Sequence, residues 1–170
     1  PQLGTLLVQV TDDDMRTVNS AILASDGTSL KVVTIDPQLV CDFGQVGLQT
    51  VASAGPIVPL PGMQDTLQRN TGMRIDGVFT LQRLALAGLV DAVGGVTITV
   101  ETQLQVSPDP DNPEWVGTGT QVLAGGVAAD YVTYRGTREV EATRTARFAS
   151  VLTAVLSALP RDEPSAENIL

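Results

Sequence analysis

Three arginines close to the end of the chain have the residue type and the spacing to bind phosphate. They are Arg135, Arg144 and Arg147. Arginine makes planar, bidentate contacts to phosphate oxygens and keeps its charge at neutral pH. The cluster therefore indicates a site for a phosphate or pyrophosphate group. A second interpretation fits the same residues: they lie on a solvated helix face and form ion pairs with Glu139 and Glu141.

A run of acidic residues offers a second kind of chemistry. Asp12, Asp13 and Asp14 follow a predicted strand. Carboxylate oxygens are ligands for hard cations such as Mg²⁺, but three aspartates in a row are equally typical of a solvated turn. The chain has no histidine and one cysteine, Cys41. Composition thus excludes Ser-His and Cys-His nucleophile pairs, His-based zinc sites and an intrachain disulfide.

The overall charge bears on the partners. The formal net charge is −9, and Lys31 is the one lysine. Binding to a DNA or RNA backbone requires clustered cations, so we expect no nucleic-acid partner. A polyanionic ligand would have to be held by a local group of arginines against the acidic field of the whole chain.

Length and composition indicate a folded domain. The 170 residues, 43% of them hydrophobic, suffice for one core. We expect a single domain over residues 1–160 and a polar tail over residues 161–170. No apolar run reaches the roughly 18 residues that cross a bilayer. Because the chain starts at Pro1 without an initiator Met, we also expect that an N-terminal segment precedes it.

The elements that must hold the arginines follow from hydrophobic periodicity. Strands are predicted at Thr5–Val10, Ser20–Ala24, Leu30–Ile35, Ile75–Phe79 and Val96–Glu101. Helices are predicted at Met63–Asn70, ended by Gly72, after a cap at Thr80 with Leu81, Leu84 and Leu89 buried, at Leu123–Tyr134 and at Glu139–Leu159. The last of these should bury one face that carries Phe148, Val151, Leu152, Val155 and Leu159. Strands mixed with helices predict an α/β fold, a single layered α/β/α domain with a mixed central sheet.

Two segments together are similar to a known family. Residues 89–96 read Leu-Val-Asp-Ala-Val-Gly-Gly-Val, and residues 123–135 carry Leu-x-Gly followed by Tyr-Val-x-Tyr-Arg. Arg144 and Arg147 add an Arg-x-x-Arg spacing, and Thr11-Asp12 matches an early motif. These features resemble the LytR-CpsA-Psr family of bacterial cell-envelope phosphotransferases, over nearly the whole chain.

The resemblance implies a fold, a ligand and a site. Members of this family transfer a glycopolymer from a polyprenyl-pyrophosphate carrier to peptidoglycan, in a fold with a mixed sheet and an apolar groove for the prenyl chain. It implies that Arg135 and Arg144 act in catalysis and, with Arg147, grip the pyrophosphate, with Arg138 as a further contact. It also implies an Asp pair for Mg²⁺, which here would be Asp12 with Asn19.

The departures from the family fall on its chemistry. Asn19 replaces the second metal-binding Asp, so we expect Mg²⁺ to bind weakly. Gln38 stands near the position of a family arginine, Thr133 replaces another, and Phe148 replaces a Gln. Each lost charge-assisted phosphate contact costs roughly 1.5–3 kcal/mol.

Two functions are consistent with this pattern. One is a catalytically impaired accessory domain outside the cytoplasm, membrane-anchored through a segment absent from this chain, which binds a polyprenyl-linked glycan or another prenyl lipid. Peptidoglycan or an active paralogue would then be a further partner. The other is an active phosphotransferase with a rearranged site. A transcriptional regulator, a label the family has often carried, is disfavoured by the acidity and by the lack of a helix-turn-helix pattern.

Overall fold

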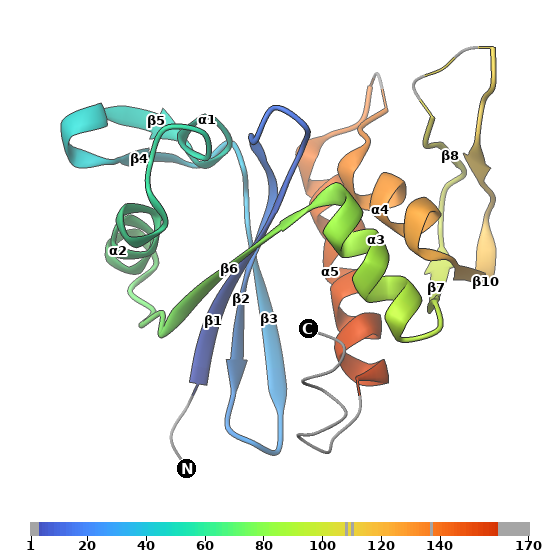
Figure 1. Ribbon diagram of the computed structural model, residues 1–170, viewed down its shortest axis with the longest axis horizontal. Helices are drawn as coiled ribbons and strands as arrows, with labels where there is room; N and C mark the ends of the chain where they lie inside the picture. The colour runs from blue at the N-terminus through green and yellow to red at the C-terminus, as the bar shows by residue number, and fades with distance from the viewer. Residues whose placement is uncertain (1–3, 108, 110, 137, 160–170) are drawn as a thin grey trace. The chain divides into compact units, whose positions relative to one another are not determined.

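The computed structural model describes residues 4–107, 109, 111–136 and 138–159 (Figure 1). The chain divides into two compact units, Pro1–Gln82 and Arg83–Leu170, called here the N-terminal and C-terminal units. The single domain expected over residues 1–160 stays a prediction, and the expected tail over residues 161–170 lies outside the described part of the chain. No helix of the described residues is long and apolar enough to span a bilayer.

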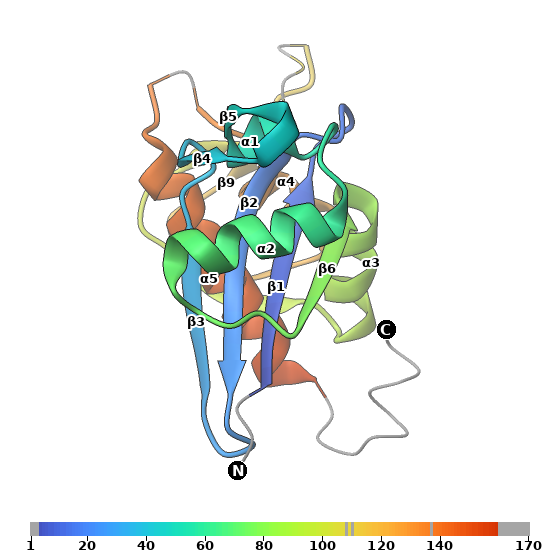
Figure 2. The same ribbon diagram turned by 90° about the vertical axis from the view of Figure 1, so that its left-hand side faces the viewer.

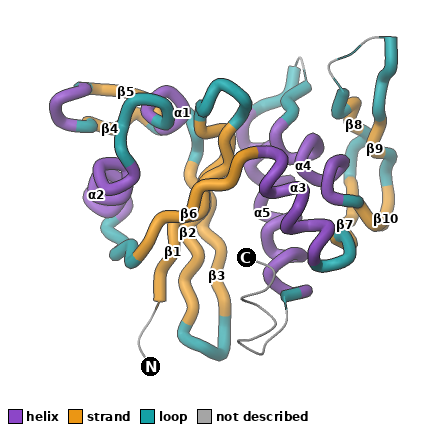
Figure 3. The backbone as a smooth tube through the Cα atoms, in the orientation of Figure 1, coloured by secondary structure: helices purple, strands orange, loops and turns teal. Residues whose placement is uncertain are grey.

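The N-terminal unit is built on a four-stranded sheet with strand order β3-β2-β1-β6 (Figures 1 and 3). β1 (Gly4–Thr11) pairs antiparallel with β2 (Thr17–Ser25) and parallel with β6 (Gly77–Gln82). β2 pairs antiparallel with β3 (Leu30–Ile35). The sheet is mixed, and helices lie between β3 and β6 in chain order. This confirms the predicted α/β class.

The hairpin between β2 and β3 is closed by one carboxylate. Asp26 accepts hydrogen bonds from the backbone N–H groups of Ser29 and Thr28 at 2.7 and 2.9 Å, and from both of their hydroxyls. These bonds favour the ionised form, with the Ser29 N–H contributing most, and they hold the pKa of Asp26 well below its usual range. Gly27, at φ 84°, supplies the left-handed backbone that the turn needs.

One core lies on a single face of this sheet. The remaining elements of the unit are β4 (Val40–Asp42), η1 (Gly44–Val46), β5 (Leu48–Thr50), α1 (Val51–Ala54) and α2 (Leu60–Thr71). Helix α2 crosses the sheet (Figure 2) and buries Met63 and Leu67 against Leu7 and Ile22. It ends at Gly72 with φ 69°, the left-handed cap that the sequence predicted.

The described residues of the C-terminal unit form three longer helices and two small sheets. In chain order it contains α3 (Arg83–Ala92), β7 (Val96–Val100), β8 (Leu104–Gln105), β9 (Trp115–Val116), β10 (Gly119–Leu123), α4 (Gly125–Thr133) and α5 (Glu141–Ala158). β7 pairs antiparallel with β10, and β8 with β9. Helix α4 packs against both α3 and α5, so α5 and the segment before it are held by α4.

The junction that suggested the family explains how α4 is placed. Gly94 and Gly95 have φ values of 83° and 88°, which let the chain turn from α3 into β7. Asp91 Oδ1, at the end of α3, accepts the backbone N–H of Gly125 at 2.7 Å and so caps α4 from a neighbouring helix. A Cβ on Gly125 would lie 2.1 Å from the Ala87 carbonyl oxygen. The two motifs therefore meet in space.

Three local predictions were wrong. Thr80 does not cap a helix: it lies within β6, because that strand continues to pair with β1 as far as Gln82. Leu84 was expected in the core but is 72% exposed, since α3 begins only at Arg83 and presents a different face. Leu123 belongs to β10 rather than to α4, because it pairs with Val96 of β7.

Candidate anion-binding site

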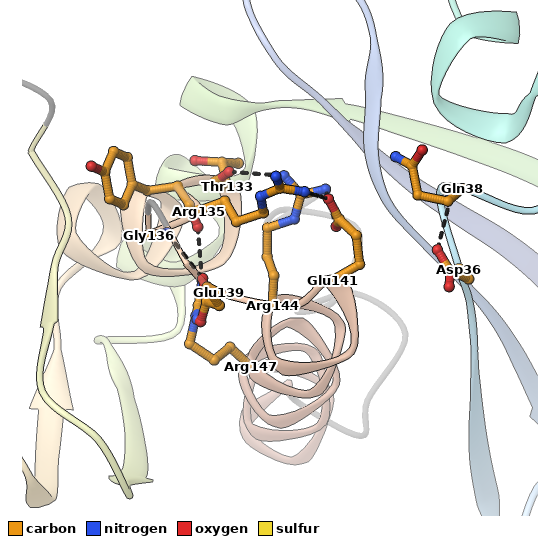
Figure 4. Close-up of polar contacts among 10 residues, drawn as sticks. Asp36, Gln38, Thr133, Arg135, Gly136, Glu139, Glu141, Arg144 and Arg147 are labelled. Carbon is orange, nitrogen blue, oxygen red and sulfur yellow. Dashed lines mark hydrogen bonds and ion pairs between the residues drawn. The ribbon is translucent and has the colours of Figure 1, made fainter.

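The arginines singled out by the sequence come together in the C-terminal unit (Figure 4). Arg135 and Arg138 lie on the connection between α4 and α5, and Arg144 and Arg147 lie one turn apart on α5. Glu139 and Glu141 lie between them in the chain. The structure therefore assembles four cations and two anions at the C-terminal end of α4 and the start of α5.

Arg147 is fully engaged by the protein. Its Nε donates to the Tyr131 carbonyl and its Nη2 to the Tyr134 carbonyl, both at 2.7 Å, while Nη1 forms an ion pair with Glu139. The guanidinium also lies 5.1 Å from the centre of the Tyr131 ring. The side chain is 8% exposed, and this burial lowers the pKa of Arg147 to about 10, so the residue stays charged at neutral pH. Its first role is to satisfy carbonyl groups at the end of α4.

Arg144 and Arg135 share one carboxylate. Glu141 Oε2 lies 2.7 Å from Arg144 Nη2, and Glu141 Oε1 lies 2.5 Å from Arg135 Nη1. Arg144 also donates to the Thr133 carbonyl at 3.4 Å, a third contact with the end of α4. The Arg144 side chain is 10% exposed, that of Glu141 13% and that of Arg135 48%.

The ion pairs with Glu139 and Glu141 that the second interpretation expected are therefore present. The solvated helix face that this interpretation also expected is wrong. Arg144 and Arg147 are buried because they reach back to the carbonyls of α4.

A pocket of about 500 Å³ adjoins the cluster, also within the C-terminal unit. Arg138, which is exposed, lines it together with Arg147, Glu139, Glu101, Gln103 and Thr143. Most of the lining residues are polar, but their carbon atoms, with Leu104 and Ala146, make up about half of the lining surface. Arg135 and Arg144 do not line it.

The residues expected to hold a metal lie in the N-terminal unit. Asp12 Oδ1 accepts the backbone N–H groups of Asp14 at 3.1 Å and Arg16 at 2.8 Å, which makes it a turn-closing residue. Asn19 lies opposite Val10 in the β1–β2 ladder and is fully buried. In the described part of the chain, no three His, Cys, Asp or Glu side chains gather as a metal site. One carboxylate and one amide fit Mg²⁺ poorly.

The segment that lacks the family arginine also forms a closed turn. Asp36, which directly follows β3, accepts the backbone N–H of Gln38 at 2.8 Å (Figure 4). The carboxylate is engaged locally, and the neutral Gln38 brings no charge for a phosphate to bind.

Comparison with known proteins settles the family. Residues 45–164 match the model of the LytR_cpsA_psr family. The chain belongs to this family. The match spans both motifs on which the resemblance was based, the junction after α3 and the segment that forms α4. No curated protein matches the chain.

Solved structures of the LytR_cpsA_psr family share the fold at low sequence identity. TagV of B. subtilis gives a TM-score of 0.83 at 15% identity over 99% of this chain and 70% of TagV. TagT bound to LI-WTA gives 0.80 at 19% identity over 92% of this chain and 64% of that one. TagT with bound octaprenyl pyrophosphate lipid gives 0.74 at 19% identity, over 91% and 65%. The chain thus spans about two thirds of the length of these relatives.

Two features of the site were missed by the sequence-based reasoning. The first is the cap from Asp91 to Gly125, which fixes α4 and therefore the connection that carries Arg135. The second is the polar pocket with Glu101 and Gln103. Each joins residues far apart in the chain, and periodicity within one segment carries no signal for such a contact.

Proposed function

We propose that this chain is a cell-envelope domain that binds a prenyl pyrophosphate, or a glycan linked to one, and that it is impaired as a phosphotransferase. Membership of the LytR_cpsA_psr family and the shared fold with TagT, which has been solved with octaprenyl pyrophosphate, support the ligand class. In this proposal Arg135, Arg138 and Arg144 contact the pyrophosphate. Arg147 supports the site by binding the Tyr131 and Tyr134 carbonyls at the end of α4.

The proposed impairment follows from the contacts that occupy the arginines within the protein itself. Phosphoryl transfer depends on positioned cations that neutralise charge in the transition state. Here Arg147 donates all three kinds of N–H to protein acceptors, and Glu141 stands between Arg135 and Arg144. Thr133 and Phe148 add no charge where the family has polar or cationic residues. The remaining positive charge supports binding better than it supports turnover.

We further propose that binding does not require Mg²⁺. Asp12 uses one oxygen to close its own turn, and Asn19 is a neutral, buried amide. Mg²⁺ bound by a protein usually needs one or two carboxylates that are open to the ligand phosphates. Chelation with EDTA should therefore leave the affinity for a prenyl pyrophosphate nearly unchanged, and a loss of tenfold or more would contradict this point.

A binding and turnover experiment tests the main proposal. Octaprenyl pyrophosphate in detergent is titrated into the protein, and release of inorganic phosphate is followed as the P–O–P bond is broken by water to leave prenyl phosphate. We expect binding without measurable release. Arg135→Gln should weaken binding about tenfold or more, and Arg69→Gln, an exposed arginine of α2, should not. Absence of lipid binding would reject the proposal.

An active phosphotransferase with a rearranged site is the second candidate. The observation in its favour is that Arg135 and Arg144 still meet at one point, on the carboxylate of Glu141. In this case Arg135 and Arg144 would be the catalytic residues. Steady release of phosphate or of prenyl phosphate, abolished by Arg144→Gln in a variant that still folds, would favour this candidate over the accessory role.

Location and partners follow from the same proposal. We place the domain outside the cytoplasm in the cell envelope, held at the membrane by a segment that is not part of this chain, with peptidoglycan or an active paralogue as a further partner. Fusion of the full-length protein to a reporter that matures only outside the cytoplasm tests the location. Sedimentation with purified peptidoglycan tests the first partner.

A further inference from the structure

Two charged side chains in the pocket of the C-terminal unit are not engaged by the protein itself. Among the described residues that line this pocket, the charged ones are Glu101, Arg138, Glu139 and Arg147. Glu139 and Arg147 form an ion pair with each other. Within the part of the chain that the structure describes, neither Glu101 nor Arg138 takes part in an ion pair. One carboxylate and one guanidinium therefore remain open to a ligand.

The two open charges are opposite in sign and line the same cavity. We infer that this pocket binds a zwitterion, a ligand with a free ammonium group and a free carboxylate, as in a short peptide. Glu101 pairs with the ammonium group and Arg138 with the carboxylate. The inference goes beyond the proposed function, because Arg135 and Arg144 do not line the pocket, and it gives Arg138 a second ligand besides pyrophosphate.

The charges of the lining favour a ligand that is neutral overall. Two carboxylates and two guanidinium groups line the pocket, so the lining has no net charge, although the whole chain has a net charge of −9. A ligand with one charge matches either Glu101 or Arg138 and brings its charge close to the other group, which has the same sign as the ligand. A zwitterion matches both groups, and its net charge of zero spares it the repulsion that the acidic chain exerts on anions.

The pocket also has the space and the surface for the part of a ligand that joins its two charged ends. Its volume of about 500 Å³ lies within the range of small-molecule sites, roughly 300–1,000 Å³. Carbon atoms, including those of Leu104 and Ala146, make up about half of the lining surface, so aliphatic groups can be buried there. The exposed side chains of Thr102, Gln103 and Thr143 offer hydrogen-bond donors and acceptors for peptide amides.

Part of the lining is held in place before a ligand binds. Tyr131 and Arg147 are buried, and Arg147 binds both the Tyr131 carbonyl and Glu139. Side chains that are already ordered lose little conformational entropy on binding. Burial raises the pKa of Tyr131, so its hydroxyl stays protonated at neutral pH and remains a hydrogen-bond donor. The two open charges therefore stand beside a preformed surface.

NMR titration with alanine peptides at physiological salt tests the inference, because it detects the weak binding that exposed ion pairs give. Trialanine is the zwitterionic probe. Its N-acetylated form lacks the ammonium group, and its C-terminal amide lacks the carboxylate. We expect trialanine to bind, and each blocked form to bind about two- to fivefold more weakly.

Two variants assign the two charges. Glu101→Gln should weaken the binding of trialanine about two- to fivefold but leave that of the acetylated peptide unchanged, because the partner of Glu101 is already missing. Arg138→Gln should weaken trialanine to a similar extent but leave the amide unchanged. Glu114→Gln and Arg69→Gln are the matched controls, since both residues are exposed and neither lines the pocket.

The contrary outcomes are distinct. No binding of trialanine at concentrations up to about 50 mM would reject the site. Equal binding of the zwitterionic and blocked peptides, or equal losses for all peptides in Glu101→Gln, would reject the ligand class. Titration with octaprenyl pyrophosphate separates this inference from the proposed function, because Glu101→Gln should leave lipid binding unchanged. Lipid binding without peptide binding refutes only the inference, and peptide binding without lipid binding refutes only the proposed function.

Discussion

Replacing Arg147 should destabilise the fold far more than replacing any exposed arginine. Arg147→Met keeps part of the apolar stem but removes two charge-assisted bonds to carbonyls, at roughly 1.5–3 kcal/mol each. It also leaves Glu139 buried without its cation, and breaking a buried pair costs about 3–5 kcal/mol. These contributions overlap because they share one side chain, so we expect a loss of about 4 kcal/mol in the free energy of unfolding.

Urea denaturation followed by circular dichroism measures this loss. Arg138→Met is the matched control, because Arg138 lines the same pocket but is exposed, and its replacement should change stability by no more than about 0.5 kcal/mol. In the double variant with Glu139→Gln, part of the loss should be recovered, since no charge is then left buried alone. A loss below about 1 kcal/mol in Arg147→Met would refute the view that this arginine is a structural clamp.

Three further predictions concern the elements that carry the site. Gly125→Ala should lower the free energy of unfolding by about 1–3 kcal/mol, because the new Cβ overpacks against α3. Gly126→Ala has open space at its Cβ and should be neutral or stabilise α4 by up to about 1 kcal/mol. Melting temperatures of the two variants measure the difference, and equal values would contradict this prediction. Asp91→Ala should lose about 0.5–2 kcal/mol in urea denaturation, and Asp91→Asn less, because the amide oxygen can still cap α4. Asp26→Asn should lower the melting temperature at pH 7 but not in strong acid. The folded pKa of Asp26 is lowered, so its contribution is present above the unfolded value of 3.8 and is lost as the pH falls through the folded value; an equal effect at both pH values would contradict it.

Regular elements were predictable where local signals were strong. The apolar spacing of Phe148, Val151, Leu152, Val155 and Leu159 predicted one face of a helix. The first four are buried on α5, whereas Leu159, which follows the last residue of the helix, is only half-buried. Gly72 was predicted to end α2, because it is the residue type that adopts a left-handed backbone at low cost.

The remaining errors arose where tertiary pairing overrode local preference. Thr80 is a good helix cap in isolation, but parallel pairing with β1 keeps it in a strand. The site was predictable only in part: the positions of the arginines and the two candidate glutamates could be named, but their burial could not. The burial of Arg144 and Arg147 depends on the carbonyls at the C-terminal end of α4, which become acceptors only once α5 packs beside them.

The double use of the arginines on α5 has a consequence for how motifs in this family are interpreted. Arg144 and Arg147 bind the carbonyls of Thr133, Tyr131 and Tyr134, so selection for folding alone would keep them after a reaction has been lost. An Arg-x-x-Arg signature would then survive in descendants that no longer turn over substrate. Exposed positions such as Arg135 contribute less to folding. They are therefore the better markers for distinguishing catalytically active members from inactive ones.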